Sequence, residues 1–315
     1  MRIAIIGANS FIGRAVCNAL DTTNHEVVAI LRDKSIENIS GAQKIVHIDD
    51  AGPEQDWQKI ISNIDVIVQL TSPKAVDNPR SSQRLDYERV IDRGTVAIGK
   101  AALTNKLKRM IFISSVKVNG EFTDGKPFAV DSLPNPKTAY AENKLKAEHG
   151  LAILSKKGLP VTIIRPPIVY GPGNTGNIGL LIKLLSLSPG WCVPLKEIKN
   201  ERSLIFVDNL SSAIISSIED PTSESRLFFA RDSEMLSTSQ LCMALLEEMG
   251  KSKVLGRDPL GFVRKTLSFC VPGLAVRLYE SLQMDDSAIK ETLNWHPPYS
   301  VYEGLSRTVE EMKQE

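Results

Sequence analysis

The fold is decided by the apolar run Arg2-Ile-Ala-Ile-Ile6 and by the turn Gly7-Ala-Asn-Ser-Phe-Ile-Gly13 that follows it. The run has the length of a buried strand, and a helical pattern then continues to Leu20. A strand, a glycine turn and a helix in this order are typical of the first unit of a parallel α/β sheet. We therefore expect the rest of the chain to repeat this alternation.

The alternation continues for about half of the sequence. Further strands are predicted at 26–31, 44–48, 65–70, 109–115, 160–164, 200–208 and 226–230. Helices are predicted at 54–61, 82–104, 139–157, 178–185, 208–219, 238–249, 261–281, 286–293 and 301–313. The fold class predicted is α/β, a Rossmann-type doubly wound parallel sheet with a smaller mixed C-terminal substrate lobe.

The boundary between the two parts is expected at the loop Arg165-Pro-Pro-Ile-Val-Tyr-Gly-Pro-Gly173, where proline and glycine accumulate. Residues 1–165 are predicted to form a dinucleotide-binding domain. Residues 166–315 are predicted to form a substrate-binding lobe, with a segment of about 204–230 returning to the first domain.

The first glycine turn has the context that a dinucleotide fingerprint requires. Gly7 would make the tight turn, and Gly13 would let the helix pack on the strand. Ser10 stands where a middle glycine would let the backbone approach a phosphate, and its hydroxyl is expected to donate a hydrogen bond there instead. The helix N-terminus would offer its backbone N–H groups to a pyrophosphate. The cofactor-binding candidates at this turn are Gly7, Asn9, Ser10, Phe11, Ile12 and Gly13.

The ends of the next strands indicate which dinucleotide is bound. An acid at the end of strand 26–31 would hold the 2′-hydroxyl of NAD, but Leu31 and Arg32 occupy this place. Because an arginine meets a 2′-phosphate bidentately, Arg32 favours NADP over NAD, against the alternative of an exposed turn arginine. The remaining candidates near the cofactor are Asp49, Asp50, Leu70 and Thr71.

The residues expected to carry chemistry lie at the end of strand 109–115 and on the next helix. Tyr140 and Lys144 are four residues apart, so they share one helix face, and Ser115 follows the apolar run. The charge of Lys144 is expected to lower the pKa of the phenol, which then exchanges a proton with a substrate oxygen that Ser115 holds. The alternative to a catalytic role is a structural one, in which the Tyr140 ring packs against the aliphatic part of the Lys144 side chain.

Composition excludes several classes of function. The chain has 315 residues and a formal net charge of +1, which gives no basic footprint for nucleic acid. Its four cysteines and four histidines show no metal-site spacing, so no metal is expected and the thiols are predicted to be reduced. The apolar segment 260–282 is interrupted by charges and by Pro272-Gly273. Two packed helices over a pocket are expected there, without an integral membrane segment, and the localisation expected is cytoplasmic.

Several motifs in order resemble one family. They are the amino-terminal turn, Ser115, Tyr140-x-x-x-Lys144, Arg165-Pro-Pro-Ile-Val-Tyr-Gly and Arg202-Ser-Leu-Ile-Phe-Val-Asp-Asn-Leu. Together they resemble the extended short-chain dehydrogenase/reductases, a family of nucleotide-sugar epimerases, dehydratases and reductases that use NAD(P).

The resemblance implies roles for individual residues. Ser115, Tyr140 and Lys144 would be catalytic, and Pro167 and Ile168 would lie near the nicotinamide. Asn177 and Arg202 would contact the substrate's diphosphate, and Lys117 and Asn119 are expected at the sugar from their position. A homodimer through helices 82–104 and 139–157 is implied as well.

The resemblance also leaves a choice of reaction. Val116 and Lys117 replace the Asp-Glu pair of the dehydratases, so dehydration is not expected. Ser-Ser-Val-Lys-Val-Asn-Gly-Glu121 and Glu280-Ser-Leu-Gln-Met-Asp285 look like the enzymes that reduce UDP-4-keto-6-deoxy-N-acetylhexosamines for surface polysaccharides. The alternatives are a UDP-sugar 4-epimerase with bound NAD (UDP-glucose or UDP-GlcNAc type) and, in another class, a non-catalytic NADP-binding sensor.

Overall fold

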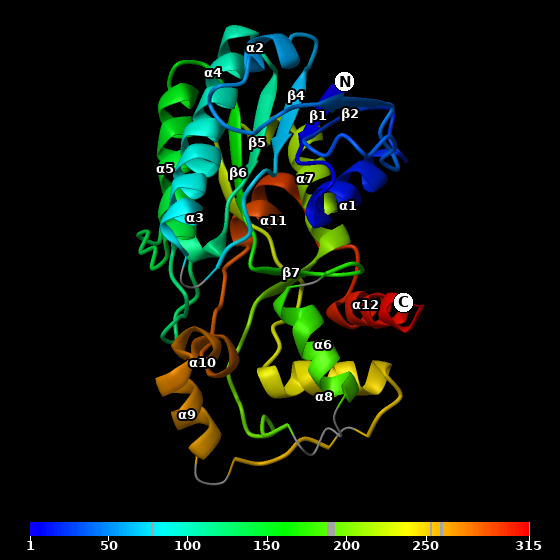
Figure 1. Ribbon diagram of the computed structural model, residues 1–315, viewed down its shortest axis with the longest axis vertical. Coiled ribbons are helices and arrows are strands. Elements are labelled where there is room, and N and C mark those ends of the chain that lie inside the picture. The colour runs from blue at the N-terminus through cyan, green and yellow to red at the C-terminus, as the bar shows by residue number, and fades with distance from the viewer. Residues whose placement is uncertain (77–78, 175, 188–192, 253, 259–260, 315) are drawn as a thin grey trace.

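The computed structural model describes residues 1–315 except 77–78, 175, 188–192, 253, 259–260 and 315 (Figure 1). A parallel sheet lies at the centre of the larger lobe, with strand order β3-β2-β1-β4-β5-β6-β9. Its strands are β1 (Arg2–Ile6), β2 (Glu26–Leu31), β3 (Lys44–His47), β4 (Val66–Gln69), β5 (Arg109–Ile113), β6 (Val161–Arg165) and β9 (Leu227–Phe229). The predicted doubly wound α/β fold is confirmed.

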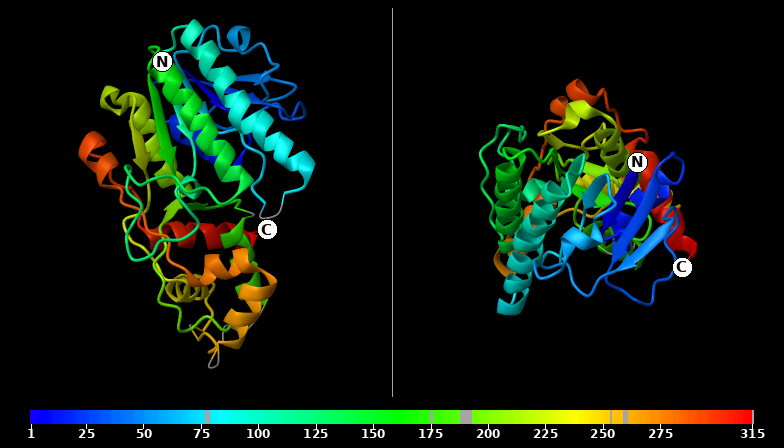
Figure 2. Two further views of the ribbon diagram at one scale, coloured as in Figure 1. Left: turned by 90° about the vertical axis from the view of Figure 1, so that its left-hand side faces the viewer. Right: turned by 90° about the horizontal axis from the view of Figure 1, so that it is seen from above.

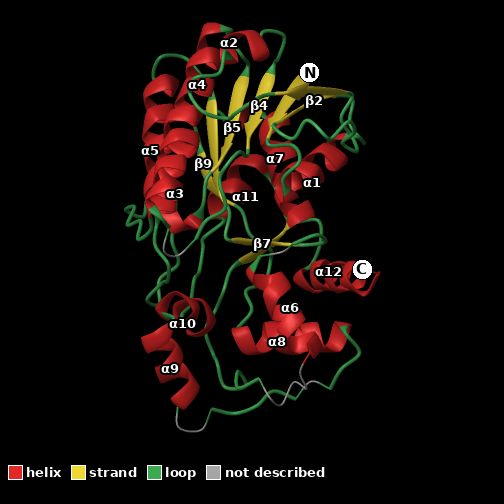
Figure 3. Ribbon diagram, viewed as in Figure 1, coloured by secondary structure: helices red, strands yellow, loops and turns green. Residues whose placement is uncertain are grey.

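Helices cover both faces of this sheet (Figures 2 and 3). One face holds α1 (Phe11–Leu20), α7 (Val207–Glu219) and α11 (Ser287–Leu293), and the other holds α2 (Trp57–Ile60), α4 (Thr95–Thr104) and α5 (Ala139–Ser155). In β1, Ile3 and Ile5 pack toward the first set, whereas Ala4 and Ile6 pack toward the second. Because both faces are covered, the strands are apolar without alternation.

Two predicted helices are built differently from the expectation. The predicted helix 82–104 consists of α3 (Ser81–Asp86), a π-helix η1 (Tyr87–Gly94) and α4. The predicted helix 261–281 is two helices, α9 (Phe262–Cys270) and α10 (Pro272–Tyr279), because Pro272 can begin a helix but cannot continue one. Segment 260–282 therefore forms two packed helices where the structure describes it.

The smaller lobe is built around its own apolar core. Its parts are β7 (Ile168–Tyr170), β8 (Leu204–Phe206), α6 (Asn177–Leu187), α8 (Thr238–Glu248), α9, α10 and α12 (Val301–Gln314), with short turns η2 (Val116–Val118) and η4 (Pro221–Ser223) elsewhere. The sequence predicted a loop where β7 pairs with β8. Of the predicted strand 200–208, Leu204–Phe206 forms a strand and Arg202 forms isolated β-bridges. The strand β7 was not predicted because prolines flank it and because its pairing partner, β8, is distant in the chain.

The segment 204–230 is divided between the lobes. The strand β8 pairs outside the large sheet, whereas α7 packs on α1 and β9 extends the large sheet beside β6. No helix in the described part of the chain is long and apolar enough to cross a membrane. The thiols of Cys17 and Cys242 are free and buried, and Cys192 lies outside the described residues.

Candidate active site

The glycine turn after β1 has the geometry of a phosphate-binding loop. Gly7 has φ +92°, which favours glycine, and a Cβ atom on Gly13 would lie 2.3 Å from the Gly7 carbonyl oxygen. Ser10 is the N-cap of α1, and its Oγ accepts the Gly13 N–H at 3.1 Å. Its place in the motif thus reflects helix capping, and because Oγ only accepts in this contact, the Ser10 O–H hydrogen remains available for the expected donation.

This turn lies at the point where strand order reverses, between β1 and β4. Leu70 ends β4 with its N–H bonded to the Ile6 carbonyl, and Thr71 packs against Gly7. In doubly wound sheets ligands bind outside the strand ends at such a reversal. The close approach of turn and helix, together with the N-terminus of α1, fits the pyrophosphate of a dinucleotide.

The residues expected at the adenosine end lie on the exposed ends of β2 and β3. Arg32 is exposed and has no ion pair among the described residues. Asp49 pairs with Lys34 at 2.7 Å, and both are exposed. Asp50 is bound by Arg89, which holds the pKa of this carboxyl below its usual value. Arg32 is therefore available to a ligand, whereas Asp50 already has a partner.

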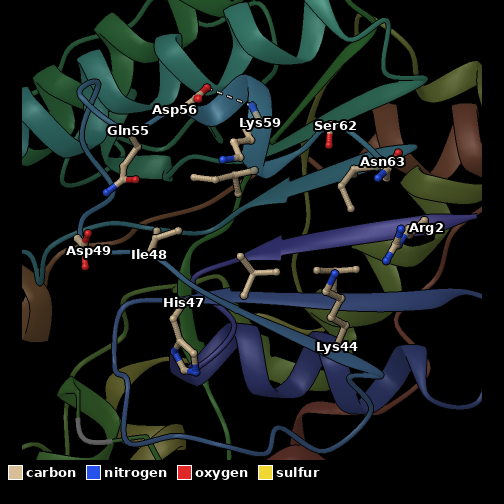
Figure 4. A pocket seen from close by; sticks show the side chains of 14 residues that line it. Arg2, Lys44, His47, Ile48, Asp49, Gln55, Asp56, Lys59, Ser62 and Asn63 are labelled. Carbon is tan, nitrogen blue, oxygen red and sulfur yellow. Dashed lines mark hydrogen bonds between the residues drawn. The ribbon is translucent and has the colours of Figure 1, made fainter.

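A separate groove of about 470 Å³ runs beside β3 and the short helix α2 (Figure 4). Lys44, His47 and Lys59 line it, and the Asp56 carboxylate accepts the Lys59 N–H at 3.2 Å. Ser115, Tyr140 and Lys144 are not among its lining residues. This groove therefore lies apart from the residues expected to carry chemistry.

The two serines after β5 have different environments. Ser114 is buried, and its hydroxyl donates to the Glu148 carboxylate, which also binds Arg165. Ser115 is partly exposed, and its Oγ accepts the Lys117 N–H at 3.3 Å. Since this contact leaves the Ser115 O–H hydrogen available for donation, Ser115 is the serine able to bind a substrate oxygen.

Tyr140 and Lys144 lie on α5, which packs against the carboxyl end of β5. The Lys144 ammonium donates to the Ile113 carbonyl at 2.8 Å and lies 5.8 Å from the centroid of the Tyr140 ring. The tertiary structure therefore brings Lys144 to the end of β5, the strand that Ser115 follows.

The sequence predicted that Lys144 lowers the pKa of the Tyr140 phenol, and this is wrong for the protein without cofactor. Burial raises the pKa of Tyr140, opposed by a hydrogen bond with Ser72. Burial also lowers the pKa of Lys144 to about 7, with the Glu148 charge acting in the opposite direction. Because the ammonium is desolvated and bonded to a carbonyl, it does not offset the burial of the phenol.

Two functional neighbours of Tyr140 were not predicted. Ser72 contacts the phenol from the segment after β4, and Tyr87 of η1 packs edge-on against the Tyr140 ring. The position of Ser72 directly after a strand end could have indicated it. Tyr87 carried no such signal, since its contact depends on the packing of η1 against α5.

The residues expected at the substrate fall into two groups. Lys117 forms an ion pair with Glu121 at 3.1 Å. Asn119 is buried, and its side-chain amide binds Arg165 and the Ser132 carbonyl, so a structural role accounts for it. Asn177 and Arg202 line a different space, an apolar cavity of the smaller lobe, together with Ile168, which begins β7 directly after Pro167.

Comparison with known proteins finds relatives that match almost the whole chain. The chain is 31% identical to a UDP-glucose 4-epimerase of Vibrio cholerae, over 98% of this chain and 94% of that one. It is 23% identical, over the same shares, to an N-acetyl-alpha-D-glucosaminyl-diphospho-ditrans,octacis-undecaprenol 4-epimerase of Escherichia coli O157:H7. The structure of a Thermotoga maritima UDP-glucose 4-epimerase has a TM-score of 0.80 at 22% identity, covering 100% of this chain and 99% of that one.

A doubly wound sheet with a glycine turn, and a Tyr/Lys helix at the end of β5, define a nicotinamide-dependent enzyme of the short-chain dehydrogenase/reductase type. The model of the NAD dependent epimerase/dehydratase family matches residues 3–227, and the chain belongs to this family.

Proposed function

We propose that the enzyme carries out oxidoreduction at C4 of a hexose linked to a diphosphate, with Ser115, Tyr140 and Lys144 as its catalytic residues. The observation that carries this proposal is that Lys144 of α5, four residues after Tyr140, binds the carbonyl of Ile113 at the carboxyl end of β5, two residues before Ser115. When bound, the nicotinamide would supply or accept the hydride.

The residues have complementary tasks in such a reaction. The Ser115 hydroxyl donates to the C4 oxygen and holds it in place. Tyr140, whose pKa is raised by burial, stays protonated at neutral pH and gives its proton to this oxygen as C4 is reduced. In the opposite direction the phenolate takes the proton back. Lys144, fixed on the Ile113 carbonyl, contributes further N–H donors for the cofactor ribose.

Epimerisation of a UDP-linked hexose is the first candidate reaction, since two of the relatives above are UDP-glucose 4-epimerases. Net reduction of a UDP-4-keto-6-deoxy-N-acetylhexosamine in surface polysaccharide synthesis is the second. Arg32 favours it, because an exposed, unpaired arginine beside β2 suits the 2′-phosphate of an exchangeable NADPH. NADP is therefore the cofactor proposed for this reduction, and NAD is the alternative, proposed for the epimerisation.

The proposed sites combine the glycine turn and the strand ends of this structure with the positions that the family resemblance implies. The turn from Gly7 to Gly13 would hold the pyrophosphate, with Leu70, Thr71, Pro167 and Ile168 toward the nicotinamide. Asp49 remains a candidate near the adenine, although Lys34 occupies it here. Lys117, Asn177 and Arg202 are the proposed substrate contacts.

Substituting Tyr140 by phenylalanine tests the proposal. Turnover should fall by about 10²- to 10⁴-fold while NAD(P)H binding, followed by fluorescence, stays unchanged. UDP-glucose, UDP-GlcNAc and a UDP-4-keto-6-deoxy sugar are assayed with and without NADPH, which separates epimerisation from reduction. A Tyr140→Phe variant with full activity would disprove the catalytic assignment. A wild-type protein that binds cofactor but converts none of these sugars would favour a sensor.

We also propose a homodimer through α3, η1, α4 and α5. Leu85 and Ile153 on these helices are large apolar side chains that are exposed in the single chain. Light scattering should give twice the mass of 34.7 kDa, and Ile153→Glu should shift the protein to the monomer. A monomeric wild type at micromolar concentration would refute this assembly.

A further inference from the structure

The cavity that contains Arg202 is lined by aliphatic side chains. It has a volume of about 360 Å³ and lies between α6, α8, α10 and β8 of the smaller lobe. Apart from Asn177, Arg202, Thr238 and Arg277, the described residues that line it are leucines and isoleucines, and none is aromatic. Burial of aliphatic surface is thus the main source of binding free energy that its walls offer.

Thr238, one of the four polar residues that line the cavity, already has hydrogen-bond partners. The Thr238 hydroxyl donates to the Leu278 carbonyl at 2.7 Å and accepts from Asn200 at 3.1 Å, so it is already engaged. A base edge that enters an apolar site without partners loses its hydrogen bonds to water, which costs on the order of 1–3 kcal/mol per group. An alkyl chain meets no such penalty.

Two cations lie together in this apolar setting. Arg202 is 5% exposed, and its guanidinium donates to the Glu280 carbonyl at 2.8 Å. The pKa of Arg202 is lowered to about 10, mainly by burial, with the Glu121 charge opposing this shift and the Arg277 charge adding to it. A diphosphate beside the Arg202 guanidinium would neutralise a charge that is costly to bury, and the half-buried Arg277 lines the same cavity.

The cavity opens along an apolar helix face. Leu180 and Leu184 of α6 line it and are also 64% and 49% exposed, and Leu187 continues the same face at 86% exposed. At the same end of the molecule, α9 exposes Phe262 and Phe269 on either side of Lys265 (Figure 1). Exposed apolar residues with basic neighbours are typical of surfaces that meet a lipid.

We propose that the diphosphate of the substrate carries a polyprenyl chain, which lies in this cavity and leaves it along Leu180, Leu184 and Leu187. This inference rests on the proposed function, because it names the carrier of the sugar whose C4 position reacts. Arg202 and Arg277 would bind the diphosphate, and the leucines would cover the first isoprene units.

The test compares two probes that share a diphosphate, farnesyl diphosphate and UDP, by titration calorimetry with the cofactor-bound protein. Farnesyl diphosphate should bind at least about tenfold more tightly than UDP. Leu184→Asn should weaken farnesyl diphosphate about tenfold and leave UDP unchanged, whereas Arg277→Gln should weaken both. Leu133→Asn, at an exposed leucine of the larger lobe that does not line the cavity, is the matched control and should change neither.

Equal or tighter binding of UDP, or loss of farnesyl diphosphate binding in the Leu133→Asn control, would overturn the inference. Measurements of turnover distinguish failure of the polyprenyl inference from failure of the proposed C4 reaction. If GlcNAc is converted at C4 on UDP and not on farnesyl diphosphate, the polyprenyl carrier is wrong and the C4 chemistry stands. If tight, Leu184-dependent binding of farnesyl diphosphate accompanies no conversion on either carrier, the carrier assignment holds and the C4 reaction is wrong.

Discussion

The ring of Tyr87 packs edge-on against the ring of Tyr140, with the two centroids 5.9 Å apart and the planes at 82°. The Tyr87 hydroxyl donates to the Lys74 carbonyl at 2.9 Å and accepts the Val76 N–H at 3.1 Å. One side chain of the π-helix thus joins the segment after β4 to the proposed proton donor. Because π-helical turns often occur at functional sites, we regard Tyr87 as a positioning residue.

Replacing Tyr87 by phenylalanine keeps the ring contact and removes both hydrogen bonds. Each bond contributes about 1 kcal/mol, so the segment 71–76 should become less ordered. We expect kcat to fall about tenfold with a smaller change in KM, and the pH profile of kcat to shift because Ser72 no longer meets the phenol. Tyr302→Phe on α12, an exposed tyrosine, is the control. Equal kcat in all three proteins would contradict a positioning role.

Substitutions of Ser114 and Ser115 should have different effects, the first on stability and the second on catalysis. Ser114→Ala leaves the buried Glu148–Arg165 pair without one donor, so unfolding free energy should drop by about 1–3 kcal/mol with activity largely kept. Ser115→Ala should leave stability nearly unchanged and lower kcat by 10-fold or more, on the order of one lost transition-state hydrogen bond. Urea unfolding and steady-state kinetics on both variants check this. The reverse assignment of effects would show that Ser114 is the catalytic serine.

Lys144 should make stability depend on pH in the protein without cofactor. Its pKa falls from 10.5 to about 7 on folding because it is buried. Between these values the unfolded chain binds more protons, so the contribution to stability rises with pH across this window and is constant below it. Relative to Lys144→Met, the wild-type unfolding free energy should rise by up to about 1.4 kcal/mol per pH unit. Parallel curves for the two proteins between about pH 7 and 9 would argue against a depressed pKa.

Arg32 should decide the choice of dinucleotide. Arg32→Ala should weaken NADPH about tenfold or more, since a charge-assisted contact to the 2′-phosphate is lost, and should leave NADH unchanged. Fluorescence titration with both cofactors measures this, and Lys34→Ala, at an exposed neighbouring cation paired with Asp49, is the control. A wild-type preference for NADH that Arg32→Ala does not alter would establish NAD as the cofactor.

Part of the site was visible in the sequence because it is local. The turn from Gly7 to Gly13 and the i, i+4 spacing of Tyr140 and Lys144 each lie within one unit of structure, where the backbone fixes side-chain direction.

The sequence by itself determined the alternation of strands and helices, because both faces of a parallel sheet are buried and each strand must be apolar throughout. It also determined the glycine turn and the Tyr/Lys spacing. Only the tertiary structure decided that Ser114 is bound by Glu148 and Ser115 is available, that Tyr87 meets Tyr140, and that Arg202 lies in an aliphatic cavity. These are contacts between segments far apart in the chain, and the burial that shifts the pKa values of Tyr140 and Lys144 exists only after those segments have packed.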